Sequence, residues 1–380
     1  MTKSRGTALL ALLACSLFVF GGPRLRAQEA APAGEEKKPP EKEKKETYKP
    51  RLLGIPFVYY SPETKLAFGG GSILNFRAGK NKEQTRPSTV YAYASYNLAK
   101  QYTVLIKPEI YVQGNSLIFS GRIRYERTPQ LFYGIGNDTA DADAESYTPL
   151  NFAVQLGVRR RIVGGLFGGF GFDVEKTTIV KVETGGLLDT GNITGSHGGL
   201  IAGLGFDLDW DTRDSPLFPL SGSFLQFAAN AYGSSAGSDF TFGRVELNLR
   251  KYFPMGLRRV LAVQAYVCST SGEVPFYKLP LLGGDSLMRG YYKGRYRDKG
   301  LALVQSEFRV LITPRIGIVG FAGLADVFPG LGRLSEGRLK FAVGSGLRYV
   351  INKRDGTTVR VDMAWGQASF GLYFTAQEAF

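Results

Sequence analysis

The stretch Arg338–Tyr349 sorts its side chains into two unlike sets at alternate positions. One set is charged or very small, and the other is apolar except at Ser345. Because side chains alternate between two faces only in an extended strand, the stretch predicts a β-strand with one polar and one apolar face. The same pattern recurs from about residue 50 onward, which is typical of a transmembrane β-barrel.

Sixteen segments carry this pattern or a weaker form of it. They are residues 52–60, 65–77, 88–98, 101–113, 116–127, 149–160, 165–179, 197–211, 221–232, 239–253, 258–269, 300–312, 315–326, 337–351, 357–366 and 369–380. Soluble strands average about 5–6 residues, whereas a tilted membrane-spanning strand needs about 9–11. Since most of the segments reach that greater length, they favour a membrane barrel over a soluble sandwich.

The lengths of the connections support the same conclusion. If the first strand starts in the periplasm, the long connections 128–148, 180–196, 270–299 and 327–336 all fall outside the cell. The turns at the other end are short, apart from 78–87 and 212–220. Bacterial barrels have even strand numbers, short periplasmic turns and longer external loops. We therefore expect an all-β fold, a transmembrane antiparallel β-barrel of about 16 strands.

The part of the chain before the barrel divides into two segments. An apolar run, Thr7–Gly22, follows Lys3 and Arg5 and is too short to span a membrane, so residues 1–27 are interpreted as a signal peptide. Residues 28–50 contain mainly Ala, Pro, Glu and Lys and predict a disordered charged periplasmic linker. The barrel is then assigned to residues 51–380.

Composition argues against several function classes. The net charge of +14 could indicate a nucleic-acid partner, but the basic residues alternate with apolar ones along strands, so we expect no nucleic acid. With one histidine, two cysteines and no G-x-S-x-G motif, we expect no catalytic residues, metal site or cofactor and predict that the chain is not an enzyme. The row Asp207, Asp209 and Asp211 is expected to pair with inward arginines such as Arg244 and Arg250.

Three segments resemble the BamA/TamA-type superfamily of outer-membrane proteins, also called the bacterial surface antigen family. The segment from Asp209 to Gly222 is similar to that family's D-x-R-D/N…P…G turn, and Leu287–Tyr291 (L-M-R-G-Y) to its V-R-G-F/Y motif. The ending from Gly346 to Phe380 resembles its last three strands. The family barrel also has sixteen strands.

The resemblance implies a set of site residues. The long external loop would fold into the lumen and dock through Met288, Arg289, Gly290 and Tyr291, with Arg289 on acidic residues of the next two strands. Glu307 is placed to be the first partner. The family's F-x-D-x-G motif here reads F-A-G-L-A (residues 321–325), with glycine in place of aspartate, so Asp326 is the expected substitute. The remaining assignments are a periplasmic turn motif (Asp211, Arg213, Asp214, Pro219 and Gly222) and a C-terminal assembly signal (Phe374 and Phe380).

The function implied by the resemblance is insertion or translocation of polypeptide or lipid at the bacterial outer membrane. The partners would be outer-membrane lipid and lipopolysaccharide, client polypeptides, a separate periplasmic protein, and the barrel assembly machinery for the chain's own insertion. The family's polypeptide-transport-associated domains have no counterpart in residues 28–50, so we expect a barrel-only member. A loop-plugged transport pore and a non-catalytic structural or surface barrel remain open as alternatives.

Overall fold

The computed structural model describes residues 50–61, 65–79, 85–98, 100–336, 338–352, 356–367 and 369–380. The predicted signal peptide and nearly all of the predicted linker lie outside these residues. Within the described part, no helix is long and apolar enough to cross a membrane.

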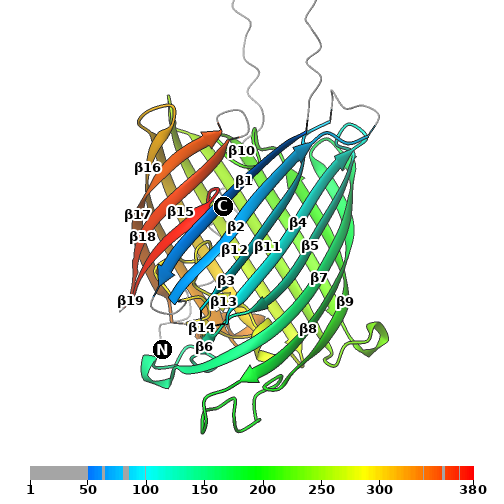
Figure 1. Cartoon of the computed structure of the whole chain (residues 1–380), viewed down its shortest axis with the longest axis vertical. Coiled ribbons are helices and arrows are strands. Elements are labelled where there is room, and N and C mark those ends of the chain that lie inside the picture. The colour runs from blue at the N-terminus through cyan, green and yellow to red at the C-terminus, as the bar shows by residue number, and fades with distance from the viewer. Residues whose placement is uncertain are drawn as a thin grey trace, which may run out of the picture.

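The described chain is built almost wholly of strands (Figure 1). They are β1 (Arg51–Ser61), β2 (Lys65–Phe76), β3 (Ser88–Asn97), β4 (Tyr102–Val112), β5 (Leu117–Arg127), β6 (Gln130–Phe132), β7 (Glu145–Val163), β8 (Leu166–Lys181), β9 (Gly198–Asp211), β10 (Gly222–Tyr232), β11 (Phe242–Pro254), β12 (Arg259–Gly272), β13 (Leu281–Leu282), β14 (Tyr296–Arg297), β15 (Gly300–Leu311), β16 (Ile316–Phe328), β17 (Lys340–Asn352), β18 (Thr357–Gly366) and β19 (Ser369–Ala376). Short 3-10 turns are η1 (Asp141–Asp143), η2 (Ser234–Ala236), η3 (Phe276–Lys278) and η4 (Leu331–Glu336).

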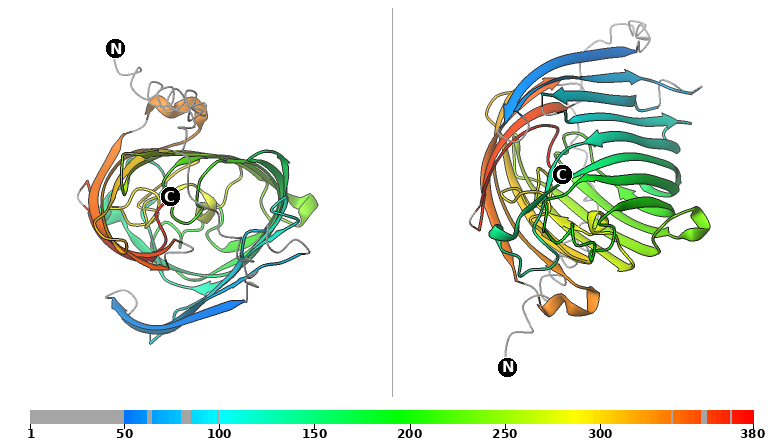
Figure 2. Two further views of the ribbon diagram at one scale, coloured as in Figure 1. Left: turned by 90° about the horizontal axis from the view of Figure 1, so that it is seen from above. Right: turned by 60° about the horizontal axis from the view of Figure 1, so that its bottom comes forward.

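One large antiparallel sheet curves into a barrel (Figures 1 and 2). Each long strand pairs with the next along the chain, and β12 pairs with β15 across the longest loop. The prediction of sixteen long strands is confirmed: all sixteen predicted segments are present. The short β6 pairs only with β7, and β13 and β14 form a separate hairpin. These three short strands were not predicted because their sequences are too brief to show a period.

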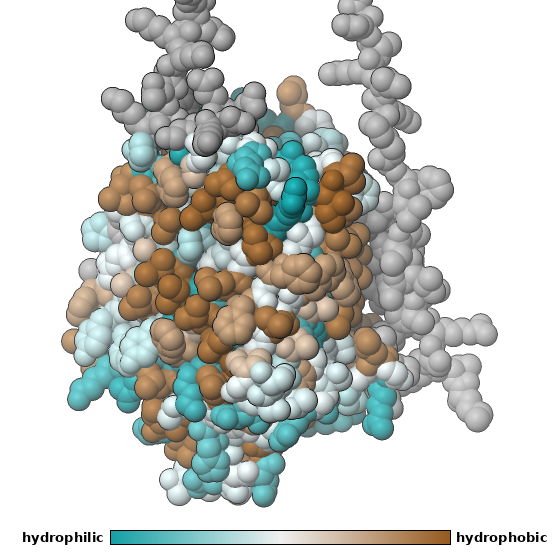
Figure 3. All heavy atoms as spheres, turned by 90° about the vertical axis from the view of Figure 1, so that its right-hand side faces the viewer, coloured by the Kyte–Doolittle hydropathy of each residue, from teal (hydrophilic) through white to brown (hydrophobic). Residues whose placement is uncertain are grey.

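The two faces of each strand differ as the alternation predicts. On β17, Phe341, Val343 and Leu347 are about half exposed on the outer surface, whereas Lys340 and Arg348 are buried at 3% exposure in the lumen. Figure 3 shows apolar side chains over the middle of the molecule and polar ones gathered at its lower end. Such an apolar outer band around a polar interior is the arrangement of a membrane-spanning barrel.

The first and last strands form the ends of the sheet. In the described part of the chain no backbone register joins β1 to β19, although β1 is fully registered with β2 and β19 with β18. Seen along the barrel, β1 lies outside the curve of the last strands (Figure 2). We call this junction between β1 and β19 the seam.

Two sequence-based predictions near strand ends are corrected. β19 ends at Ala376, not at residue 380, and Gln377 turns with a positive φ of 67°. If the alternation continued, the Glu378 carboxylate would lie among the outward apolar residues, and a charge that faces lipid is costly. The chain instead turns inward and buries Phe380 at 4% exposure. The alternation places Arg338 on the polar face of its strand together with Lys340 and Arg348, but Arg338 precedes β17 and is exposed, paired with Asp138.

Glycines on neighbouring strands provide a matched test of the lumen packing. A Cβ at Gly344 would collide with the Phe321 ring and the Met363 carbonyl oxygen, whereas a Cβ at Gly320 would meet open space. We expect Gly344→Ala to lower the free energy of unfolding by about 1–3 kcal/mol through overpacking. Gly320→Ala should leave it nearly unchanged. Urea unfolding of the barrel in detergent micelles measures both, and equal effects would contradict this packing.

Candidate functional site: the docked loop motif

The connection between β12 and β15, residues 273–299, folds back into the barrel (Figure 2). Its side chains Leu282, Met288 and Tyr291 are buried in one apolar cluster. The barrel side of that cluster is supplied by four strands, through Tyr266, Cys268, Leu301, Leu303, Ala325, Val327 and Ala342. The loop is held in a defined position, because a closely packed apolar cluster tolerates few alternative arrangements of its side chains.

Arg289 lies at the centre of the docked motif and is 2% exposed. Its guanidinium donates to Glu307 on β15 and, at 2.6 Å, to Asp362 on β18. The same group lies 3.5 Å from the centre of the Phe321 ring on β16. A planar guanidinium can serve two carboxylates and an aromatic face at once, which a lysine ammonium cannot do.

The second carboxylate partner differs from the one expected. Asp326 on β16 pairs with the Lys340 ammonium of β17 at 3.3 Å and not with Arg289. The second carboxylate that binds Arg289 is Asp362. Asp362 lies 73 residues from Arg289 in the chain. The resemblance implied partners only on the two strands that follow the loop, β15 and β16, so it did not predict a partner on β18. An alternating strand such as β18 gives Asp362 no local signal that separates it from other inward polar residues.

Met288 and Gly323 depart together from the family's pattern, and their contact gives a reason. Met288 is buried with a positive φ of 64°, and its sulfur would lie 3.0 Å from a Cβ at Gly323. An aspartate at position 323 would therefore require the Met288 side chain to shift, because its Cβ would press against the methionine sulfur and the Gln305 Cβ. Asp362 supplies from β18 the negative charge that Gly323 cannot supply from β16.

Gly290 and Tyr291 fasten the motif to the last strands. Gly290 has a positive φ of 108°, and a Cβ there would meet the Gly366 nitrogen at 2.8 Å, so a glycine is needed for the close approach to β18. Its amide donates to the Tyr373 hydroxyl on β19 at 2.9 Å. The Tyr291 hydroxyl donates to the Phe341 carbonyl at 2.9 Å, and burial raises the pKa of this phenol.

Four arginines and three carboxylates form a buried network around this motif. Apart from Arg289, Glu307 and Asp362, the members are Arg309, Arg348, Arg360 and Glu378. All seven side chains are at most 7% exposed. Buried charges are stable only when they are paired and hydrogen-bonded, so each member depends on the others. We call this set the arginine cluster.

The outer end of the loop is anchored separately. Arg295 donates to Asp141 at 2.5 Å and to the Thr139 carbonyl at 2.8 Å, both in the connection between β5 and β7. In the same region the Gly136 amide donates to the Arg297 carbonyl at 2.8 Å. The docked loop is therefore tied to two distant parts of the barrel.

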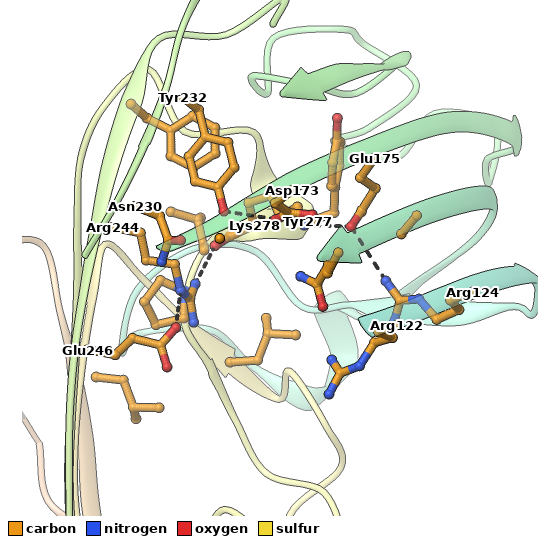
Figure 4. A pocket seen from close by; sticks show the side chains of 18 of the residues that line it. Arg122, Arg124, Asp173, Glu175, Asn230, Tyr232, Arg244, Glu246, Tyr277 and Lys278 are labelled. Carbon is orange, nitrogen blue, oxygen red and sulfur yellow. Dashed lines mark hydrogen bonds and ion pairs between the residues drawn. The ribbon is translucent and has the colours of Figure 1, made fainter. Parts of the chain in front are cut away.

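Beside the loop the lumen contains a cavity of about 460 Å³ (Figure 4). The loop forms one wall, and β5, β7, β8, β10, β11, β12 and β15 form the other. Five basic and three acidic side chains line it: Arg122, Arg124, Arg244, Lys278 and Lys293, with Asp173, Glu175 and Glu246. Several are paired, with Lys278 at 2.6 Å and Arg124 at 3.5 Å from Glu175. We call this cavity the chamber.

The turn between β9 and β10 forms a compact hydrogen-bonded unit. Asp211 accepts from the Arg213 side chain at 2.9 and 3.0 Å, and Asp214 accepts from the amides of Leu220 and Ser221. Pro219 is buried, and Gly222 has a positive φ of 98° where a Cβ would strike the Thr212 carbonyl. These contacts account for the residue types in the turn by local folding alone.

The aspartate row on β9 pairs differently from the expectation. Asp209 binds Arg159 on β7 at 2.6 Å and Asp211 binds Arg213, whereas Arg244 binds Glu246 on its own strand. The long arginine side chain reaches across two strands, which pairing between adjacent strands alone does not predict. No group of His, Cys, Asp or Glu side chains suited to a metal ion occurs in the described part of the chain.

An antiparallel barrel with an apolar exterior and an inward-folded loop defines an outer-membrane β-barrel protein. The family model described as the Omp85 superfamily domain matches residues 67–352, well over half of the chain. The chain therefore belongs to the Omp85 superfamily, which confirms the expected family and the bacterial outer membrane as its location. No curated protein matches the chain.

Solved structures show the same fold at low sequence identity. BamA from Haemophilus ducreyi lacking POTRA domains 1–3 is 16% identical, with a TM-score of 0.54 over 86% of this chain and 69% of that chain. CdiB from Acinetobacter baumannii is 11% identical (TM-score 0.52; 86% of this chain and 59% of that one), and CdiB from Escherichia coli is 9% identical (TM-score 0.54; 86% and 61%). The chain thus spans less than two thirds of the CdiB chains.

The role of Arg289 can be tested by a conservative exchange. Arg289→Lys keeps the charge but cannot bridge Glu307 and Asp362 while stacking on Phe321, so we expect a loss of about 3 kcal/mol in unfolding free energy. Arg338→Lys is the matched control, since Arg338 is 74% exposed in its pair with Asp138. Urea unfolding of the micelle-bound barrel checks the difference, and equal small losses in both variants would count against the bridging role.

Proposed function

We propose that this barrel assists the insertion or translocation of polypeptide or lipid at the outer membrane. The observation that carries the proposal is the seam, where β1 and β19 share no backbone register within the described residues. An unpaired strand edge exposes donors and acceptors that can template an incoming strand. A seam that parts would also connect the lumen to the lipid sideways.

The chemistry of the seam fits such a role. On β19, Phe370, Leu372 and Phe374 are all more than half exposed on the outer face. An incoming strand pairing at this edge would continue an apolar outer surface, so its own lipid-facing side chains would be buried in the membrane from the start. The assembly signal predicted at Phe374 and Phe380 is proposed here for Phe374 alone, because Phe380 faces inward.

The partners follow from this role and are part of the same proposal. Outer-membrane lipid and lipopolysaccharide would surround the apolar band, and client polypeptides would reach the seam from the periplasm. A separate periplasmic protein would deliver the clients, and the barrel assembly machinery would insert this chain itself. The turn that holds Asp211, Arg213 and Asp214 is proposed to lie at the periplasmic end of the barrel.

Locking the seam provides the test. In a Cys268→Ala background, single cysteines placed along β1 and along β19 are combined and screened for pairs that form disulfides, which would seal the junction. We expect sealed barrels to lose insertion of a small eight-stranded outer-membrane barrel into proteoliposomes. Reduction should restore the activity.

A disulfide elsewhere in the sheet controls for rigidity. Met363 and Leu372 face each other in the register of β18 and β19 and lie on the outer face, so a disulfide between cysteines at these positions joins strands that are already paired. This control should insert clients at the unmodified rate. Full activity in the sealed barrel would exclude lateral opening, and inactivity of both would point to a nonspecific effect.

The chamber supports a second candidate, a loop-plugged transport pore. Its polar lining and volume of about 460 Å³ suit a small hydrated solute, and its basic side chains outnumber the acidic ones. A structural or surface barrel, the third candidate, would neither insert clients nor conduct.

Channel recording separates these candidates. If the docked loop plugs a pore, Arg289→Ala in planar bilayers should convert small unstable currents into larger openings that favour anions. The unmodified barrel and the Arg338→Ala variant serve as controls. Unchanged small currents in Arg289→Ala would contradict the pore.

A further inference from the structure

The segment after β19, residues 377–380, is built into the lumen and not into the sheet. The Gln377 amide donates to the Thr358 carbonyl at 2.7 Å, which fixes the inward turn. Phe380 then packs with Tyr252, Val260 and Ala262 at 4% exposure. We call residues 377–380 the tail.

The tail contributes a carboxylate to the arginine cluster. Glu378 accepts from Arg348 at 2.8 Å and lies 3.7 Å from Arg309. Arg309 also donates to the backbone oxygen of Phe380 at 2.9 Å. Glu378 is 2% exposed, so water does little to compensate its charge or the charges of its partners.

Both arginines that hold the tail also hold the carboxylates of Arg289. Arg348 donates to Asp362 at 2.5 Å, and Arg309 binds Glu307 at 2.6 Å. Two short chains of ion pairs therefore lead from Glu378 to Arg289, one through each arginine. The docked loop and the tail meet in the same buried network although they enter it from different segments of the chain.

The charge balance of the cluster depends on the tail. Within the seven side chains of the cluster, arginines exceed carboxylates by one when Glu378 is counted and by two when it is not. The half-exposed Asp285, 3.9 Å from Arg360, lies outside this set. In a buried site an extra uncompensated charge is strongly destabilising. Without Glu378, all four arginines would compete for the two remaining carboxylates, Glu307 and Asp362. Arg289 would then hold its carboxylates less firmly.

We propose that Glu378 is a positioning residue for the docked loop. It neutralises Arg348 and Arg309, which leaves Glu307 and Asp362 available to Arg289. Withdrawal of the tail from the lumen would loosen the loop, so the segment that follows the seam strand β19 controls how firmly the lumen is closed. The proposal concerns the closed barrel and holds whether the protein inserts clients or conducts solutes.

The test measures loop mobility in the full chain. A spin label at Lys293→Cys, in the Cys268→Ala background, reports on the loop by electron paramagnetic resonance. Glu378→Gln should give a mobile component approaching that of Arg289→Ala, with trypsin cleavage within residues 273–299 about tenfold faster, since cleavage follows local opening. The matched control is Glu273→Gln, an exposed glutamate of the same loop, which should behave like the parent.

A double variant separates charge balance from simple packing. Arg348→Gln combined with Glu378→Gln removes both members of one pair and restores an excess of one arginine, so it should return the label toward immobility. Loss of tail packing alone would show no such rescue. An immobile label in Glu378→Gln, while Arg289→Ala is mobile, would overturn the proposal, and so would a double variant as mobile as the single one.

Folding is checked by heat-dependent gel mobility and circular dichroism. Should Glu378→Gln fail to fold, the double variant is still expected to fold, because its charge excess equals that of the parent. Failure of both would overturn the charge-balance account. Because every readout concerns the loop, failure of the seam experiment would leave this result standing.

Discussion

The buried guanidinium of Arg289 is the contact on which the arrangement of the lumen depends. It joins Glu307 on β15, the Phe321 ring on β16 and Asp362 on β18, so one side chain fixes the loop to three strands. Such a group is stable inside a barrel only because its partners are themselves held by Arg309, Arg348 and Arg360. The loop, the tail and the last strands are thus parts of one electrostatic unit.

The sheet could be predicted from sequence because its signal is local and repeated. A strand such as β17 places Phe341, Val343 and Leu347 toward lipid and Lys340 and Arg348 toward the lumen. Each such strand contains its own evidence in alternate positions, and the lengths of the connections identify which end faces outward. The end of β19 could not be predicted from that alternation. One charged residue, Glu378, in the apolar phase was the only sign that the strand stops.

The site could be predicted only in part because its contacts join distant segments. The motif around Arg289 and the position of Glu307 follow from resemblance, and the structure brings these two side chains together. Asp362 is one inward polar residue among many, and nothing in its neighbourhood in the sequence distinguishes it. Glu378 stands out of phase with the alternation, but that phase does not reveal its arginine partners. The contact between Met288 and Gly323 explains why a family position changes, but only once the loop is seen against β16.

The last strand and the arginine cluster are physically connected. β19 lacks a registered neighbour on the β1 side in the described residues, so hydrogen bonds from β18 hold only one of its edges. Its further support comes from inside, where Tyr373 binds Gly290 and the tail after Ala376 binds Arg348. The docked loop therefore supports the last strand from inside the barrel. A last strand that is held from the lumen keeps the ion pairs of the cluster inside the barrel and away from lipid, where unpaired charges would be costly.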